Sequence, residues 1–218
     1  MMLGQISLNL SFLMYMFLYL PQVIHNQKQT NLAELSKWMH LTLYLGYSLD
    51  LLYGFGSNLP WQYRTVSAIG WLLLTIQHVQ LIHHFKQTEQ KFFQIGFYSI
   101  LMCSTALLML LSINPKPFVH LALYILGYAA QIAFVIAFIP QILKSKRLQS
   151  AQALSIFYIL LCLFLAILDG ISAWQLNWGW PNKLGSCLII LLTSMLLMQY
   201  YRYQFSKRMR REQPLLQR

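Results

Sequence analysis

The sequence predicts an all-α membrane protein: a bundle of seven transmembrane helices, made of two parallel three-helix repeats joined by a linker helix (3+1+3). Three observations lead to this fold class. Of the 218 residues, 57% are hydrophobic and only 10% are charged, whereas a soluble domain carries about 25% charged residues. Seven apolar runs have about the 20 residues that cross a bilayer. The chain also resembles itself after a shift of 119 residues.

The apolar runs follow one another with short connections, so little backbone lies outside helices, as hydrocarbon requires. No basic residue precedes the first run and no small-residue cleavage site ends it, so we interpret it as a retained helix rather than a signal peptide. The predicted helices cover residues 6–24, 35–55, 63–85, 92–113, 118–143, 153–176 and 184–205.

The basic residues predict the orientation of the bundle. The connections after the first, third and fifth runs, together with the C-terminal tail, hold 13 of the 16 Lys and Arg residues. This bias predicts an outside or lumenal N-terminus and a cytoplasmic C-terminus, in a bacterial inner membrane or an endolysosomal membrane. The cluster at 207–211 is expected to contact anionic lipids. Topology thus explains the net charge of +11, and no nucleic-acid partner is expected.

The internal repeat relates the first three helices to the last three without a gap. The fourth helix is left over, and one extra crossing gives both copies the same direction across the membrane. The predicted units are a first repeat at 1–88, a linker helix at 89–116, a second repeat at 117–206 and a basic cytoplasmic tail at 207–218. The matched pairs include Pro21-Gln22 with Pro140-Gln141, Leu35-Ser36 with Leu154-Ser155, Leu49-Asp50 with Leu168-Asp169, and Gln80 with Gln199.

Two short segments carry a resemblance to a known family. They are Tyr19-Leu20-Pro21-Gln22 and Phe138-Ile139-Pro140-Gln141, each followed by a basic loop that ends in Leu-Ser. Here the chain resembles the PQ-loop (MtN3/saliva) family, which includes cystinosin, lysosomal amino-acid exporters, SWEET sugar transporters and the KDEL receptor; the exporter branch is nearest. The resemblance implies alternating access, with Pro21, Gln22, Pro140 and Gln141 as hinges. A proline weakens a helix locally because it removes a hydrogen bond, and the neighbouring glutamine can bond the freed backbone.

Two acidic residues lie inside predicted helices. An Asp in a transmembrane helix costs about 2.5–3.5 kcal/mol, so Asp50 and Asp169 should face the bundle interior. Helical spacing places Tyr47 beside Asp50 and Cys162 beside Asp169, with phenols in the first half and small residues in the second. We expect one cavity with two carboxyls, forming a substrate or proton site. Gln80 and Gln199 either line this cavity or bond neighbouring helices.

Two carboxyls suit a cationic solute better than a neutral sugar. The leading hypothesis is therefore a transporter of an amino acid or amine-bearing metabolite, with proton symport as its candidate mechanism. The family's amino-acid exporters carry a Gly-Asp pair where this chain has Gly46-Tyr47 and Leu165-Ala166. Two alternatives stay open. One is a sugar facilitator of the SWEET type, whose pockets usually lack buried acids. The other is a sorting receptor like the KDEL receptor, which needs a basic lumenal pocket.

No nucleophile–base pair, phosphate loop or metal-spaced cluster is recognisable, so we predict neither an enzyme nor a cofactor or metal. The three cysteines lie inside apolar runs, which argues against a disulfide framework. Five histidines lie mostly at helix ends and are expected at the level of the lipid headgroups: His25, His40, His78, His83 and His84. The oligomeric state is left open.

Overall fold

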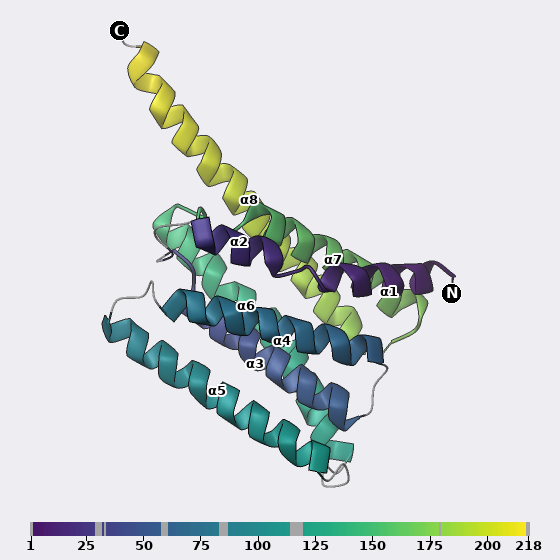
Figure 1. Cartoon of the computed structure of the whole chain (residues 1–218). Helices are drawn as coiled ribbons and strands as arrows, with labels where there is room; N and C mark the ends of the chain where they lie inside the picture. Colours follow the sequence, from purple (N-terminus) through teal and green to yellow (C-terminus); the bar gives the residue numbers. More distant parts are fainter. Residues whose placement is uncertain are drawn as a thin grey trace.

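The computed structural model describes residues 2–28, 32, 34–57, 61–82, 87–113, 120–178 and 180–216. Within these ranges the chain is helical apart from short turns (Figure 1). The first predicted crossing consists of two helices, and each later crossing is one helix. The helices are α1 (Met2–Tyr15), α2 (Leu20–Lys28), α3 (Lys37–Gly56), α4 (Trp61–Ile82), α5 (Gln87–Ile113), α6 (His120–Leu148), α7 (Ile156–Gln175) and α8 (Trp180–Leu216).

Six helical segments of the described chain are long and apolar enough to cross a membrane; α1 and α2 count together as one of them. The remaining helix, α3, has 20 residues, a comparable length, but carries polar side chains that include His40, Ser48 and Asp50. It packs against α4, α5 and α6, and 12 of its residues are buried. Because protein rather than lipid surrounds α3, polar side chains are tolerated there. The predicted all-α membrane bundle is confirmed.

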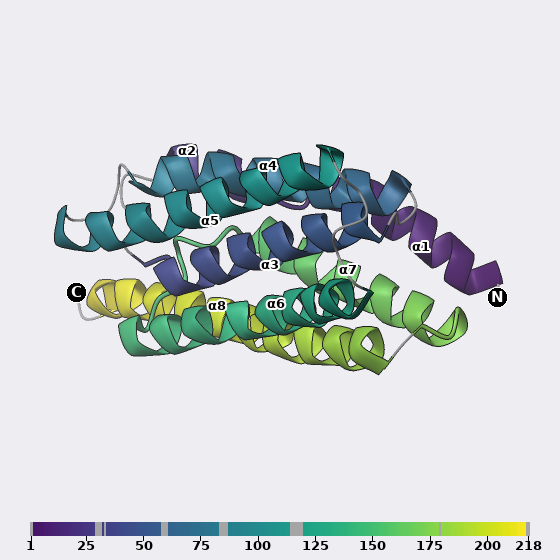
Figure 2. The same ribbon diagram turned by 90° about the horizontal axis from the view of Figure 1, so that it is seen from below.

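Both repeats have the same internal order. In the first, α4 contacts α1, α2 and α3; in the second, α8 contacts α6 and α7. Among the described residues, no contacts join α3 to α1 or α2, or α6 to α7. The third helix of each repeat therefore lies between its first and second helices. Across the interface α3 packs on α6, and α7 packs on α1 and α2, so the second helix of each repeat meets the first helix of the other (Figure 2).

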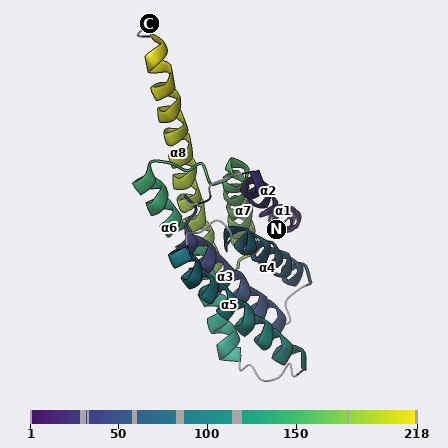
Figure 3. The ribbon, with the colours of Figure 1, turned by 60° about the vertical axis from the view of Figure 1, so that its left-hand side comes forward.

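The linker helix, α5, breaks this symmetry. It packs against α3 and α4 and, within the described ranges, against no other helix (Figure 3). It runs along the outer edge of the first repeat, away from α7 and α8 (Figure 1). Residues between α3 and α4 are thus covered by a further helix, whereas the equivalent groove of the second repeat has no such cover in the described part of the chain. The last turns of α8 extend beyond the bundle (Figure 1).

The two motif prolines occupy different local structures. Residues 16–19 form turns between α1 and α2, and Pro21 is the second residue of α2. A proline in the first helical turn loses no helix hydrogen bond, because its amide would be unpaired there anyway. Pro140 instead lies inside α6, which continues to Leu148. The expectation of a long first helix kinked at an interior proline was therefore wrong, since that helix is interrupted before Pro21.

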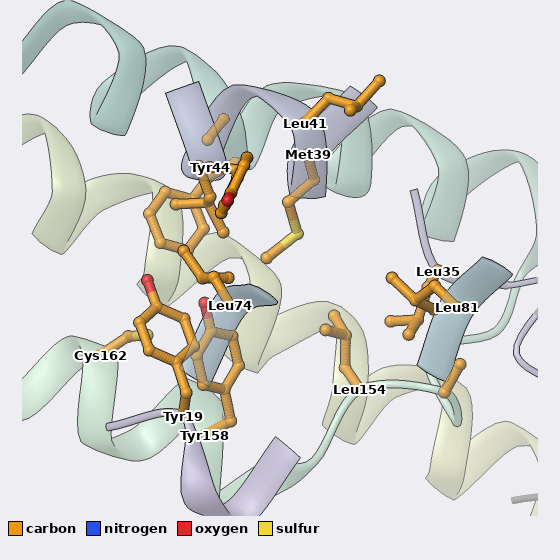
Figure 4. Close-up of a cluster of buried hydrophobic side chains, with 14 of the residues drawn as sticks. Tyr19, Leu35, Met39, Leu41, Tyr44, Leu74, Leu81, Leu154, Tyr158 and Cys162 are labelled. Atoms are coloured by element: carbon orange, nitrogen blue, oxygen red, sulfur yellow. The ribbon is translucent and has the colours of Figure 1, made fainter. Parts of the chain in front are cut away.

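The motif end of the bundle, called here the PQ face, is densely packed. Tyr19 and Tyr158 lie with ring centroids 5.7 Å apart. Figure 4 shows these two rings beside Cys162, with Leu35 and Leu154 further along the same buried cluster. The helix ends at the other side of the bundle, where α4 and α8 begin, are called the opposite face.

Gly70 fixes the position of Tyr47, and we predict that Gly70→Ala destabilises the fold. A Cβ at residue 70 would lie 2.2 Å from Cε1 of Tyr47. That ring is buried and packs edge-on against Tyr19 and Phe134, with centroid distances of 5.5 and 4.9 Å. Overpacking of this kind costs about 1–3 kcal/mol, which a lower thermal unfolding midpoint in detergent would report.

The matched control is Gly96→Ala in α5. A Cβ there would first meet Leu41 Cδ2, at 3.4 Å, an ordinary packing distance. Alanine also favours a helix over glycine by about 1 kcal/mol. The control should therefore match or exceed the wild-type midpoint, and equal midpoints for the two variants would contradict this account of Tyr47.

Candidate functional site

The glutamine of each Pro-Gln motif bonds the other repeat. Gln22 Nε2 donates to the carbonyl of Ala153 at 3.0 Å, and Gln22 Oε1 accepts the amide of Ser155 at 2.8 Å. Ser155 is the N-cap of α7. Gln22 is buried, so its side chain supplies partners to backbone groups that water cannot reach.

Gln141 repeats this arrangement in the other direction. Its Oε1 accepts the amide of Ser36, the N-cap of α3, at 2.6 Å, and its Nε2 donates to the carbonyl of Glu34 at 3.3 Å. Ser36 and Ser155 are equivalent by the 119-residue shift, as are the two glutamines. We call these two sets of hydrogen bonds the PQ clasps. The glutamines therefore bond the backbone of the opposite repeat, and on their own helices they bond a side chain four residues on rather than the freed backbone groups that we expected.

Further contacts join the two repeats at the PQ face, and the one made by Glu34 occurs in one direction. Glu34 Oε2 accepts hydrogen bonds from Ser150 Oγ at 2.9 Å and from the amide of Gln152 at 3.0 Å. The equivalent of Glu34 in the second repeat is Ala153, which has no carboxyl group. Together with the clasps, this carboxylate holds the PQ face closed.

A cavity of about 840 Å³ lies between the repeats. Its lining includes Gln5, Gln62 and Asn182, which lie near the starts of helices at the opposite face. At the other end it stops at Tyr19 and Phe138, each two residues before a motif proline. The cavity therefore extends from the opposite face toward the PQ clasps, which close it.

Both membrane-embedded acids line this cavity, as do Tyr47 and Cys162. Asp50 is buried, with Tyr63 OH donating to Oδ1 and Ser67 Oγ donating to Oδ2. Asp169 is partly exposed and accepts the hydroxyl of Tyr15 on Oδ2. Tyr15 belongs to the first repeat and Asp169 to the second, so this bond crosses the interface.

Phenols and amides make up most of the remaining polar lining. The expectation that phenols come from the first half alone was wrong, because α6 and α7 contribute three of them. A stripe of cavity residues at helical spacing in α6, from Tyr124 and Tyr128 to Phe138, is the sequence signal that points to these additional residues. The tyrosines are Tyr15, Tyr19, Tyr47, Tyr53, Tyr63, Tyr124, Tyr128 and Tyr158, and the amides are Gln5, Asn9, Gln62, Gln131 and Asn182.

Gln80 and Gln199 lie outside the cavity lining. Gln80 Nε2 donates to the carbonyl of Val23 at 3.4 Å, and Gln199 Nε2 donates to the carbonyl of Ile142 at 3.2 Å. These carbonyls are equivalent by the same 119-residue shift. Each glutamine thus ties the third helix of its repeat to the first, so interhelical bonding describes them and a place in the substrate or proton site does not.

The comparisons with known proteins agree with this architecture. The family described as PQ loop repeat matches residues 3–63 and again residues 122–182, two segments that begin 119 residues apart and together cover more than half of the chain. A solved structure of a eukaryotic SWEET transporter aligns over 93% of this chain and 99% of its own, with a TM-score of 0.63 and 17% sequence identity. No curated protein matches the sequence significantly.

The duplicated helical triplet around an internal cavity defines the chain as a multi-pass membrane transporter. It belongs to the PQ-loop repeat family, because the two matched segments fall on the repeats that contain both clasps.

We predict that Gln141→Ala weakens the fold because it leaves the amide of Ser36 and the carbonyl of Glu34 without the glutamine partner. A buried polar group that loses its hydrogen bond costs about 1–3 kcal/mol. The thermal unfolding midpoint in detergent should fall clearly. Gln175→Ala, at the exposed last residue of α7, is the control and should leave the midpoint unchanged; a similar loss in both variants would contradict the role of the clasp.

Proposed function

We propose that this protein moves a small amine-bearing solute, an amino acid or a related metabolite, across its membrane by alternating access. The observation that carries the proposal is the charge of the cavity. Among the described residues that line it, the acidic ones are Asp50 and Asp169, and there is no Lys, Arg or His. A membrane-embedded acid is expensive, which favours a functional role, and two acids without a basic partner favour a cationic ligand.

The two carboxyls have different surroundings, and this favours different roles. Both oxygens of Asp50 already accept hydroxyl groups, whereas Asp169 is more exposed and accepts a single phenol. Asp169 is therefore the carboxyl that we expect an ammonium group to contact. The surrounding tyrosine rings can add cation–π attraction. An amino-acid carboxylate would find amide N–H donors among the glutamine and asparagine side chains of the cavity.

Tyr15 gives binding at Asp169 a route to the rest of the molecule. It is the last residue of α1, directly before the turns at 16–19 and before Pro21. An ammonium group that takes Oδ2 of Asp169 would displace this phenol and release the end of α1. Pro21 and Pro140, with Gln22 and Gln141, remain our proposed hinges, because opening the PQ face requires both clasps to separate.

The basic residues favour a cytoplasmic PQ face and an outside or lumenal N-terminus. In that orientation the cavity faces outside or the lumen, and the clasps close the cytoplasmic side. Proton linkage is part of the proposal. An acid in a cavity that faces the two sides in turn can load a proton on one side and release it on the other.

A sugar is the second candidate, on the strength of a specific observation. Eight phenols and five amides line the cavity, and such groups can bond sugar hydroxyls as well as an amine. A solved structure with a similar fold is that of a SWEET transporter. We rank the amine first because neutral sugars do not require two carboxyls in the cavity. The receptor alternative gains no support, since the cavity lining is acidic.

The test is transport by purified protein in liposomes, with a panel of labelled amino acids, amines and sugars offered in counterflow. We expect saturable exchange of an amine-bearing solute. Asp169→Asn should lower this exchange at least about tenfold, because it removes the charge that would attract the ammonium group.

Asp50→Asn separates solute binding from proton linkage. It should keep counterflow exchange but lose accumulation driven by a pH gradient. Cys103→Ala, at an exposed position of α5 outside the cavity lining, is the control and should change exchange less than about threefold. Exchange of sugars but not of any amine, unchanged by either Asp variant, would overturn the amine assignment.

A further inference from the structure

Two buried histidines lie outside the cavity, between α3, α4 and α5. His40 and His78 are 2% and 0% exposed, and their ring centroids are 5.8 Å apart. Both lie near helix ends, as the sequence indicates, but their rings are buried between helices and do not project toward lipid headgroups. His83 and His84 lie outside the described residues, and His25 contacts the carbonyl of Gln152 at 2.9 Å.

These imidazoles keep nitrogen atoms without partners. His78 Nδ1 bonds the carbonyl of Leu74 at 2.7 Å; because a carbonyl only accepts, Nδ1 carries the hydrogen and Nε2 is a free acceptor. That Nε2 and both nitrogens of His40 have no hydrogen bond in the described structure. A buried polar atom without a hydrogen-bond partner lowers the stability of the fold. A protein that needed only packing here would do better with apolar side chains.

The surroundings of His78 suit a cationic ring. Phe93 and Phe97 of α5 stack on it almost parallel, at 5.1 and 5.0 Å between centroids. Aromatic faces attract a protonated imidazole. Tyr44 lies 4.9 Å away. Lys144 of α6 is the charged group that acts on His40, and its positive charge opposes a second one. The rings therefore favour a proton on His78, whereas burial between the helices disfavours charge on both imidazoles, so a proton held here leaves readily.

A polar stripe joins this pair to the cavity. On α4 it runs from Ser67, which donates to Asp50, through Trp71 and Thr75 to His78. The α3 side of the stripe is Ser48, Tyr44 and His40, at intervals of four residues. Two hydrogen bonds cross between the helices: Trp71 Nε1 to Ser48 Oγ at 3.1 Å, and Thr75 Oγ1 to Tyr44 OH at 3.2 Å.

The second repeat lacks this stripe. Shifted by 119 residues, His40 falls on Ile159 and His78 on Leu197, while Tyr44, Ser48 and Trp71 fall on Leu163, Ile167 and Ile190. The equivalent groove between α7 and α8 is not covered by a linker helix in the described structure, and Ile167 there is exposed. The polar stripe and the helix that shields it from lipid thus occur together in one repeat only.

We propose that His40 and His78 form a proton-binding site that loads and unloads during transport, on the same polar stripe as Asp50. An incoming proton adds to a free imidazole nitrogen and forms an imidazolium, and the same N–H bond breaks when the proton leaves, so no other reactant is needed. This inference rests on the proposed transport function.

The test replaces both histidines by the residues of the second repeat, as His40→Ile with His78→Leu. Liposomes containing the variant are assayed for solute counterflow and, with a trapped pH dye, for proton movement driven by a solute gradient. We expect counterflow within about twofold of wild type and solute-driven proton flux at least tenfold lower. The unfolding midpoint should be equal or higher, because unpartnered polar groups are removed.

The matched control is His25→Gln in α2 at the PQ face, which should leave proton flux unchanged. Unchanged flux in the double variant, or no solute-driven flux in a wild-type protein that exchanges solute, would overturn the histidine site and leave the transport proposal standing. Absence of any exchange in wild type would instead be the failure of the transport proposal. Should the double variant not fold, ¹⁵N NMR of wild-type histidines from about pH 4 to 8 decides: two buried rings that titrate support the site, and rings that never change exclude it.

Discussion

The structure depends on one constraint: the backbone at the start of α3 and of α7 is buried at the PQ face, where lipid and packed side chains exclude water. Each of these helix starts receives its missing partners from a glutamine of the other repeat. A glutamine suits this role because its amide offers a donor and an acceptor on one planar group. The clasps join the two repeats by hydrogen bonds that form only when the PQ face is closed. In the proposed transport cycle, opening of the PQ face breaks both clasps together.

Upon this symmetric frame the chain builds three asymmetric features. The first helix is interrupted before its motif proline while α6 continues through its own. Glu34 bonds the loop of the second repeat without an equivalent contact in return. The linker helix covers polar residues in the first repeat alone. Symmetric contacts join the two halves at the PQ face, and the asymmetric features make the halves differ. A break between α1 and α2 lies beside Asp169 in one, and a shielded polar stripe lies behind Asp50 in the other.

Much of the fold could be predicted because lipid imposes few solutions on an apolar chain. Run lengths gave the crossings, and the 119-residue register gave the parallel repeats that the family match reproduces. The convergence of Asp50 and Asp169 on one cavity also followed, because an acid inside a membrane helix has to avoid lipid. Their roles in binding stay a prediction. The phenols of α6 were not predicted, because the position of the cavity was inferred from the acids and α6 carries none. The partners of Gln80 and Gln199 were left open, because a side-chain amide can line a polar cavity or hydrogen-bond a backbone carbonyl equally well.

The sequence by itself determined the helical crossings, the internal duplication and the presence of two acids away from lipid, since these depend on local hydropathy and spacing. Only the tertiary structure decided which groups meet. It paired each motif glutamine with the opposite repeat, set Tyr15 against Asp169 and buried His40 beside His78 under α5. Such contacts join residues far apart in the chain, and side-chain partners at that range are fixed by how helices pack and cross, which no local pattern encodes.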